Sequence, residues 1–128
     1  MANILIIDDT PEDLLLLRRV LGTQHHIRAV NSGQRALDVA SRPPQPDLIL
    51  LDVKIPGMDG YAVLAALREN PATTAIPVLI VSSVDSDDDE ERGLALGAAD
   101  YISKPLRAAV VVARVRAHLE LQAARELL

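Results

Sequence analysis

The chain has 128 residues, which is the size of one folded domain built around one hydrophobic core. Apolar residues make up 49% and charged residues 24%, which excludes a disordered or membrane-embedded chain, and the absence of cysteine excludes disulfides and cysteine-ligated zinc and fits a cytoplasmic location. The net charge of -5 and the presence of only two aromatic residues, Tyr61 and Tyr101, argue against nucleic-acid binding.

The first predicted strand covers residues 4–7, an apolar segment too short to be the core of a signal peptide, so we expect no membrane targeting. A helix follows, because residues typical of a helix start come next in order: Asp9 or Thr10 as cap, Pro11 in the first turn, and Glu12 with Asp13 at the positive end of the helix dipole. A second strand at residues 26–30 mixes polar and apolar residues, which favours an edge of the sheet.

Two further strands, at residues 48–51 and 78–81, are continuously apolar, which is typical of central parallel strands buried on both faces. The last predicted strand, at residues 99–102, mixes polar and apolar residues and suits the other edge, and Gly97 can end the helix before it. Because strands and helices alternate, we predict an α/β fold in which a doubly wound, five-stranded parallel sheet carries five helices on its two faces.

The last helix is expected to begin near Leu106, with Leu106, Val110 and Val112 packed on the sheet, and the sequence contains no signal that would stop it. Beyond this point the apolar residues keep the alternating four-and-three spacing of a coiled-coil seam: Ala117, Leu121, Ala124 and Leu128. We therefore expect a domain of residues 1–119 and a helical extension of residues 120–128. The extension either frays in solvent, pairs two copies of the chain, or leads into an effector domain of a longer protein.

Carboxylates follow two of the predicted strands, with Asp8 and Asp9 after the first and Asp52 after the third. Ligands of such a sheet bind beyond the carboxyl ends of its strands, so we expect these carboxylates to converge there. At about 5 Å and an effective dielectric of about 20, each pair of full charges repels by roughly 3 kcal/mol, which favours a bound divalent cation such as magnesium. Ser82 ends the fourth strand and Lys104 follows the fifth, so a hydroxyl and an ammonium join the same edge. Together these residues supply a nucleophile, a metal site and donors for phosphoryl oxygens.

In order, spacing and context, these motifs resemble the CheY-like receiver domains of two-component response regulators over residues 3–119. The resemblance is carried by the Asp8-Asp9 pair, Asp52 in LLDVKIPGMDG, Ser82 in PVLIVSS and Lys104 in GAADYISKP. It implies a flavodoxin-like sheet with strand order 2-1-3-4-5. It also implies a protein that assists only its own phosphorylation and dephosphorylation and is not otherwise an enzyme.

The resemblance implies a role for each residue of the site. Asp52 is the expected phosphoacceptor, and its donor is a sensor histidine kinase or a phosphotransfer protein. Asp9, Asp52 and the backbone carbonyl of Lys54 are expected to bind magnesium, for which manganese can substitute, while Asp8 acts mainly through water. Lys104 is expected to bind the phosphoryl group.

A switch is also implied by the resemblance. Ser82 turns toward the phosphoryl oxygen and Tyr101 moves from an exposed to a buried position, so that the fourth helix, the fifth strand and the fifth helix form the output face. The bond between Lys104 and Pro105 is expected to be cis. Val84 offers no polar group to orient an attacking water, which suggests slow self-dephosphorylation.

Other interpretations fit the sequence less well. A phosphatase with an aspartate nucleophile needs a second acid at the position of Lys54, and a flavin protein needs a phosphate loop rich in Ser, Thr and Gly where this chain has Asp-Asp-Thr-Pro. Two alternatives stay open: a degenerate receiver that acts as an unphosphorylated interaction module, and acids that merely cap helices. The three histidines are expected to be exposed to solvent: His25, His26 and His118.

Overall fold

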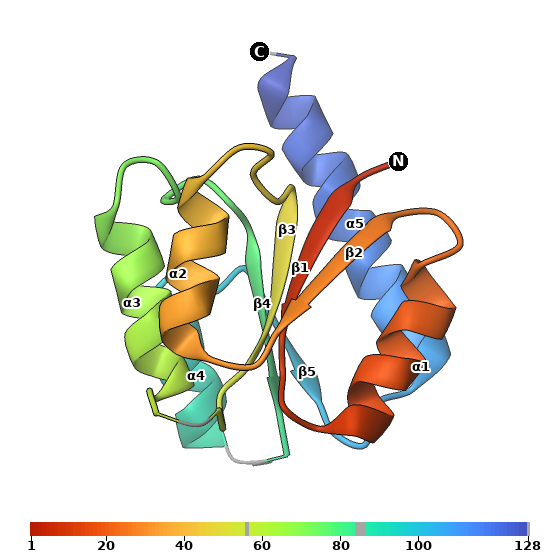
Figure 1. Ribbon diagram of the computed structural model, residues 1–128, viewed down its shortest axis with the longest axis horizontal. Helices are drawn as coiled ribbons and strands as arrows, with labels where there is room; N and C mark the ends of the chain where they lie inside the picture. Colours follow the sequence, from red (N-terminus) through yellow and green to blue (C-terminus); the bar gives the residue numbers. More distant parts are fainter. Residues whose placement is uncertain (56, 84–86, 128) are drawn as a thin grey trace.

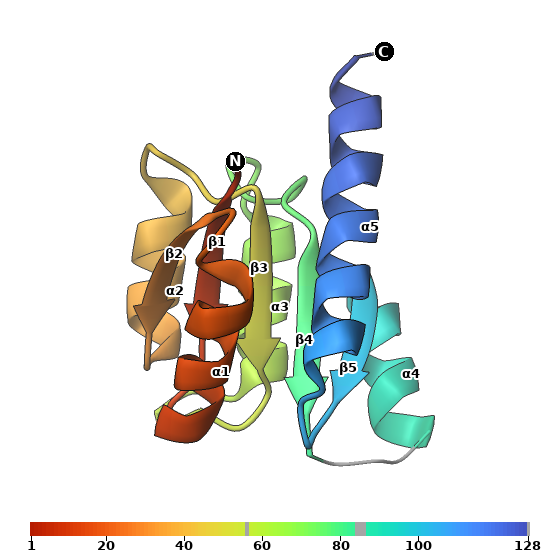
Figure 2. The ribbon, with the colours of Figure 1, turned by 90° about the vertical axis from the view of Figure 1, so that its right-hand side faces the viewer.

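The computed structural model of the chain describes residues 1–55, 57–83 and 87–127. Strands and helices alternate in the order β1 (Asn3–Ile7), α1 (Pro11–Leu21), β2 (His26–Val30), α2 (Gly33–Ser41), β3 (Leu48–Asp52), α3 (Gly60–Glu69), β4 (Val78–Ser82), α4 (Asp87–Ala95), β5 (Asp100–Ser103) and α5 (Ala108–Glu126). Within the described residues the strands form one parallel sheet in the order β2-β1-β3-β4-β5. Helices α1 and α5 cover one face of the sheet, and α2, α3 and α4 cover the other (Figures 1 and 2).

This arrangement confirms the predicted flavodoxin-like fold and its strand order. The predicted strands agree with the observed ones to within one residue at each end, and the last strand begins at Asp100, one residue later than expected. No helix in the described part of the chain combines the length and the apolar character that a bilayer-spanning helix needs.

The sheet has a separate apolar core on each face. Successive side chains of a strand point to opposite faces, so Leu5 and Ile7 of β1 pack in the core under α2 and α3, while Ile4 and Ile6 pack in the core under α1 and α5. All four side chains are at most 1% exposed. Burial on both faces is the reason that the central strands are continuously apolar.

The start of α3 lies unusually close to the end of β3. The Gly60 N–H donates to the carbonyl of Val53 at 3.0 Å, and a Cβ atom on Gly60 would lie 2.4 Å from the Val53 Cα. Only glycine allows this approach. It fixes the backbone just after Asp52, which is the last residue of β3.

Helix α5 differs from the prediction in its buried face. It begins at Ala108, two residues after Leu106, and the residues that it buries fully are Val111 and Val115. Val110 and Val112 were expected at these places, but they are only half-buried. Residues four apart share one face of a helix, so Val111 and Val115 lie together on the sheet. The prediction placed the helix in the wrong rotation.

The far end of α5 projects past the sheet, at the end of the molecule opposite to the carboxyl ends of the strands (Figures 1 and 2). Along this stretch the apolar residues of the predicted seam are exposed, and the Leu121 side chain keeps 47% of its surface accessible. The last member of the predicted seam, Leu128, lies outside the described residues.

The prediction of exposed histidines is wrong for two of the three. The His118 side chain is 17% exposed, and its Nε2 lies 2.9 Å from a carboxylate oxygen of Asp100. His25 is half-buried, and its Nδ1 accepts a hydrogen bond of 3.1 Å from the Ala2 N–H. His26 is exposed, as expected. The His118 and His25 rings contact residues that are distant in the sequence, which a local pattern does not reveal.

Candidate functional site

The carboxyl ends of β1 and β3 bring three acids together. Ile7 pairs with Leu51 in the sheet, so the residues that follow the two strands, Asp8 with Asp9 and Asp52, meet at the same edge. One carboxylate oxygen from each acid lies within 4.8 Å of the others. Asp8 is 2% exposed and Asp52 4% exposed, whereas Asp9 is open to solvent. This arrangement places like charges side by side at the rim of the sheet.

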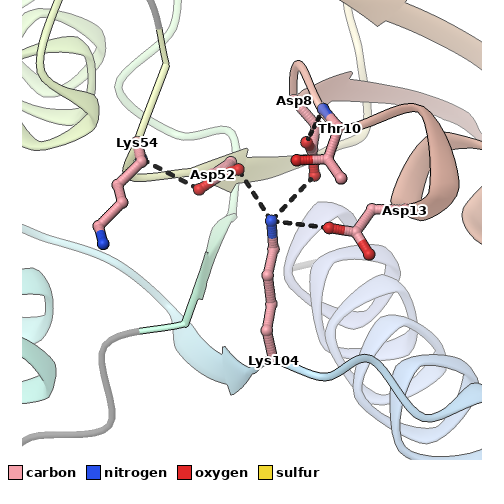
Figure 3. Close-up of polar contacts among 6 residues, drawn as sticks. All are labelled: Asp8, Thr10, Asp13, Asp52, Lys54 and Lys104. Atoms are coloured by element: carbon pink, nitrogen blue, oxygen red, sulfur yellow. Dashed lines mark hydrogen bonds and ion pairs between the residues drawn. The ribbon is translucent and has the colours of Figure 1, made fainter.

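Both oxygens of the Asp52 carboxylate are engaged. Oδ1 accepts a hydrogen bond of 3.0 Å from the Lys54 N–H, and Oδ2 accepts one of 2.9 Å from the Lys104 Nζ (Figure 3). The Lys54 side chain is exposed and points away from Lys104. Lys54 therefore contacts Asp52 through its backbone, and its predicted role as a carbonyl ligand of the metal stays a prediction.

The Lys104 ammonium contacts three carboxylates. Its Nζ lies 2.8 Å from an oxygen of Asp13, 2.9 Å from Asp52 and 3.6 Å from Asp8 (Figure 3). Burial acts to lower the pKa of Lys104, but the hydrogen bonds to Asp13 and Asp52 and the charges of Asp52 and Asp8 outweigh it and raise this pKa above its ordinary value. The amine is therefore held in its charged form within the cluster.

Asp8 is the most deeply buried acid of the cluster. Its Oδ1 accepts a hydrogen bond of 2.8 Å from the Thr10 N–H, in the turn that leads into α1. Burial raises the pKa of the Asp8 carboxyl, and the Thr10 hydrogen bond and the Lys104 charge only partly offset this effect. Ionising Asp8 is thus less favourable than ionising an exposed aspartate, and a bound metal cation beside it would oppose that effect.

Sequence reasoning did not identify Asp13 as part of the site, because an acid in the first turn of a helix is explained by the helix dipole. The spacing did contain a signal, since Asp13 follows Asp9 by four residues, about one helical turn. What the sequence could not reveal is that the Lys104 side chain, from the other end of the chain, extends to the same place.

Ser82 and Lys104 are joined through the backbone at the ends of β4 and β5. The Lys104 N–H donates to the Ser82 carbonyl at 2.8 Å, and the peptide bond between Lys104 and Pro105 is cis, as the resemblance implied. Ser82 is fully buried and follows Val81, the residue that pairs with Asp52 in the sheet. The strand pairing thus puts the Ser82 residue next to the acids, and its role toward a phosphoryl group stays a prediction.

Tyr101, the other predicted switch residue, lies on β5. It is half-buried and packs against the core under α2 and α3. Its movement between an exposed and a buried position stays a prediction. Val84, on which the expectation of slow dephosphorylation rests, lies outside the described residues.

Comparison with known proteins identifies relatives along nearly the whole chain. The family model of the response regulator receiver domain matches residues 4–116. The chain is 36% identical, over 99% of its length, to a Vibrio cholerae protein named "Probable cyclic di-GMP phosphodiesterase", and it spans 29% of that protein. It is 39% identical, over 90% of its length, to the response regulator PleD of Caulobacter vibrioides, and it spans 25% of PleD. The chain therefore corresponds to roughly a quarter of each relative.

Solved structures of the same fold cover the chain equally well. The signal receiver domain of a Vibrio parahaemolyticus protein superimposes with a TM-score of 0.91 at 27% identity, over 98% of this chain and 95% of that one. The BeF3-activated receiver domain of Klebsiella pneumoniae RstA gives a TM-score of 0.80 at 36% identity, over 91% and 97% of the two chains. The Mn(2+)-bound form of the response regulator Rcp1 gives 0.77 at 26% identity, over 98% and 92%.

Proposed function

This chain belongs to the family of response regulator receiver domains, and we propose that its Asp52 accepts a phosphoryl group from a sensor histidine kinase or a phosphotransfer protein. The observation that carries the proposal is the convergence of three carboxylates, from Asp8, Asp9 and Asp52, within 4.8 Å of one another, with the Lys104 ammonium 2.9 Å from Asp52. A carboxylate nucleophile beside a cation is the arrangement that phosphoryl transfer to aspartate needs.

The donor set fits a hard divalent cation. It consists of carboxylate oxygens, which magnesium and manganese prefer, and their negative charges are close enough for one ion to contact more than one of them. Asp9, Asp52 and the carbonyl of Lys54 would hold the ion, with Asp8 acting through water. When bound, the ion supplies positive charge that neutralises the carboxylates and the phosphoryl oxygens. Manganese in the related protein Rcp1 supports this assignment.

The residues of the chain then have distinct tasks in the transfer. A carboxylate oxygen of Asp52 forms a bond to phosphorus while the bond from phosphorus to the donor atom breaks, and the electron pair of the broken bond stays with the donor. Lys104 and the Ser82 hydroxyl donate hydrogen bonds to the phosphoryl oxygens. Attack of water on the same phosphorus breaks its bond to Asp52, releases inorganic phosphate and restores the carboxylate, so the chain assists only its own phosphorylation and dephosphorylation.

The test is phosphorylation of the whole chain by acetyl phosphate with magnesium. We expect Asp52→Asn to abolish incorporation and chelation of the metal to do the same, whereas Asp38→Asn, which removes an exposed acid of α2, should leave it unchanged. Labelling of the Asp52→Asn variant at the unmodified rate would refute the assignment. A folded chain that takes no label from acetyl phosphate or from any kinase would instead be a degenerate receiver, acting as an unphosphorylated interaction module.

The proposed response to phosphorylation involves Ser82 and Tyr101 and changes the face formed by α4, β5 and α5. A hollow of about 270 Å³ opens on this face, and Tyr101, Arg107 and Arg114 are among the residues that line it. The related RstA domain is described as BeF3-activated, and adding beryllofluoride here as a phosphoryl mimic should change Tyr101 fluorescence and hydrogen exchange in β5. Unaltered values for both would exclude this switch.

We also propose that residues 1–119 form the receiver and residues 120–128 a helical extension that pairs two copies or leads into an effector domain. The exposed Leu121 and the small share of each relative that this chain spans support the proposal. Self-association should be compared with and without beryllofluoride, in the full chain and in one ending at residue 119. A truncation at residue 116 would remove His118 and Leu119, which pack on the domain. Equal self-association of both chains in both states would exclude pairing through the extension.

A further inference from the structure

Asp13 has no task in the proposed transfer, yet its carboxylate makes the shortest contact to Lys104. The distance is 2.8 Å, against 2.9 Å for Asp52 and 3.6 Å for Asp8. The side chains of Asp13 and Lys104 are 19% and 15% exposed, so water screens this ion pair less than one on the open surface. The contact joins the first turn of α1 to the segment that follows β5.

The geometry of the ammonium explains what this contact can do. A lysine ammonium has three N–H donors. Asp13 and Asp52 lie at hydrogen-bond distance from Nζ, whereas Asp8 at 3.6 Å lies beyond it. In Figure 3, Asp13 and Asp52 approach the nitrogen from different sides. Two contacts therefore fix the nitrogen, and a third donor is left for an incoming oxygen.

We propose that Asp13 is a positioning residue for phosphoryl transfer, an inference that rests on the proposed function. It acts through Lys104, whose long side chain has many rotamers and would otherwise depend on Asp52 for its position. During transfer Asp52 loses its full negative charge as its oxygen bonds to phosphorus. The N–H of Lys104 that held Asp52 can then join the third N–H in donating to phosphoryl oxygens, and Asp13 holds the nitrogen in place while this exchange occurs.

A carboxylate at this place also adds negative charge, which would repel an anionic phosphodonor. That effect is the smaller one, because water and salt screen the Asp13 charge from a donor that is still in solution, whereas Asp13 contacts the Lys104 ammonium directly at 2.8 Å. Loss of the Asp13 charge should therefore slow the transfer step, without making the approach of the donor easier.

The kinetic test compares three variants of the full chain: Asp13→Asn, Asp13→Glu and, as a matched control, Glu12→Gln. Glu12 is the exposed neighbour on the same turn, so its variant removes the same charge from the same helix end. With magnesium and saturating acetyl phosphate, Asp13→Asn should lower the rate constant about five-fold with the half-saturating donor concentration unchanged. Asp13→Glu should recover most of the rate, and Glu12→Gln should match the unmodified chain.

A spectroscopic test does not depend on phosphorylation. The chain has only two lysines, Lys54 and Lys104, so lysine-selective isotope labelling yields two side-chain ammonium signals, and Lys54→Arg assigns them. The Lys104 signal should exchange its protons slowly in the unmodified chain and in Glu12→Gln, and rapidly in Asp13→Asn. An ion pair that only tethers α1 would lower the melting temperature of Asp13→Asn while the rate constant of the folded protein stayed unchanged.

The inference is overturned if Asp13→Asn is phosphorylated at the unmodified rate or faster, or if the Lys104 signal is unaffected. Failure of the proposed function is a separate result: it would be seen as absent labelling of the unmodified chain, or as continued labelling of Asp52→Asn.

Discussion

Charged side chains at the two ends of the parallel sheet differ in how well they are paired. At the carboxyl ends of the strands, Asp8, Asp9 and Asp52 lie together, and Asp9 has neither a hydrogen bond nor an ion pair with any other described residue. At the amino ends, the Arg68 guanidinium donates to the backbone carbonyls of Gly97, Thr74 and Ile76, at 2.9, 2.9 and 2.8 Å. The carboxyl ends thus keep three like charges together, whereas the half-buried charge of Arg68 at the amino ends is hydrogen-bonded to three carbonyls.

A second cluster at the amino ends follows the same rule. The Asp100 carboxylate at the start of β5 receives contacts from Arg114 at 2.6 Å and from His118 at 2.9 Å, both on α5. Among the described residues no buried side-chain nitrogen or oxygen lacks a hydrogen-bond partner. The comparison shows that polar groups stabilise this fold where they are paired, and that a ligand is expected where like charges are kept together.

Removing Arg68 should have the largest effect on stability. Arg68→Met keeps the aliphatic stem but leaves three carbonyls without their charged donor, so we expect a loss of about 3 kcal/mol in the free energy of unfolding. Urea denaturation measures it, with Arg42→Met as the control, because the Arg42 side chain is 73% exposed. Phosphorylation of the folded Arg68→Met protein should be unchanged. A loss of activity at full stability would contradict the division between the two ends.

At the opposite end, Asp9→Asn should weaken magnesium binding by about tenfold, because a charged ligand becomes neutral. The metal-free protein should be equally or more stable, since removing one charge relieves repulsion with its neighbours. Calorimetric titration and denaturation with a chelator measure the two quantities, and Asp38→Asn is the control. A clearly destabilised metal-free variant would mean that Asp9 acts as a helix cap.

The smallest effect is expected for Asp100, and it depends on pH. Burial acts to raise the pKa of the Asp100 carboxyl, but hydrogen bonds from His118 and from the Tyr101 N–H, with the charge of Arg114, hold it below its ordinary value. A lowered folded pKa contributes stability that is present above the ordinary pKa of about 3.9 and is lost as pH falls through the folded value.

Asp100→Asn should therefore be less stable than the unmodified chain by about 1 kcal/mol at pH 6, and the difference should shrink steadily below pH 4. Urea denaturation at a series of pH values measures this. Asp38→Asn is the reference, because Asp38 is exposed and its ion pair is with the exposed Arg42. A difference that stays constant down to pH 3 would show that the Asp100 charge does not contribute.

The sequence predicted the features that depend on chain order and missed those that depend on how helices rotate against the sheet. A continuous apolar run such as residues 48–51 is best explained as a parallel strand buried on both faces, and the acids that follow such strands must meet at one edge. The valines at residues 110–112 are consecutive and fit any rotation of α5, so the burial of Val111 could not be read from them.

The same limit applies to two titratable residues whose partners the sequence did not reveal. Asp13 and His118 lie on helices, and both were interpreted from local context, as an acid at a helix start and a histidine on an exposed helix end. Their partners, Lys104 and Asp100, are far along the chain or on another element. Pairing of this kind is decided by tertiary packing, which a single sequence does not display.

Helix α5 packs on the domain as far as Leu119 and projects beyond it. Its described length from Ala108 to Glu126 is 19 residues, and the fully buried side chains, Val111 and Val115, belong to the first half. At 1.5 Å per residue, Glu126 lies about 10 Å beyond Leu119, so a tilt of about 10° around the packed part of the helix would displace it by about 2 Å. The displacement grows linearly with distance from the pivot. A shift of a fraction of an ångström beside the phosphoacceptor would therefore be magnified at the opposite pole of the molecule by leverage.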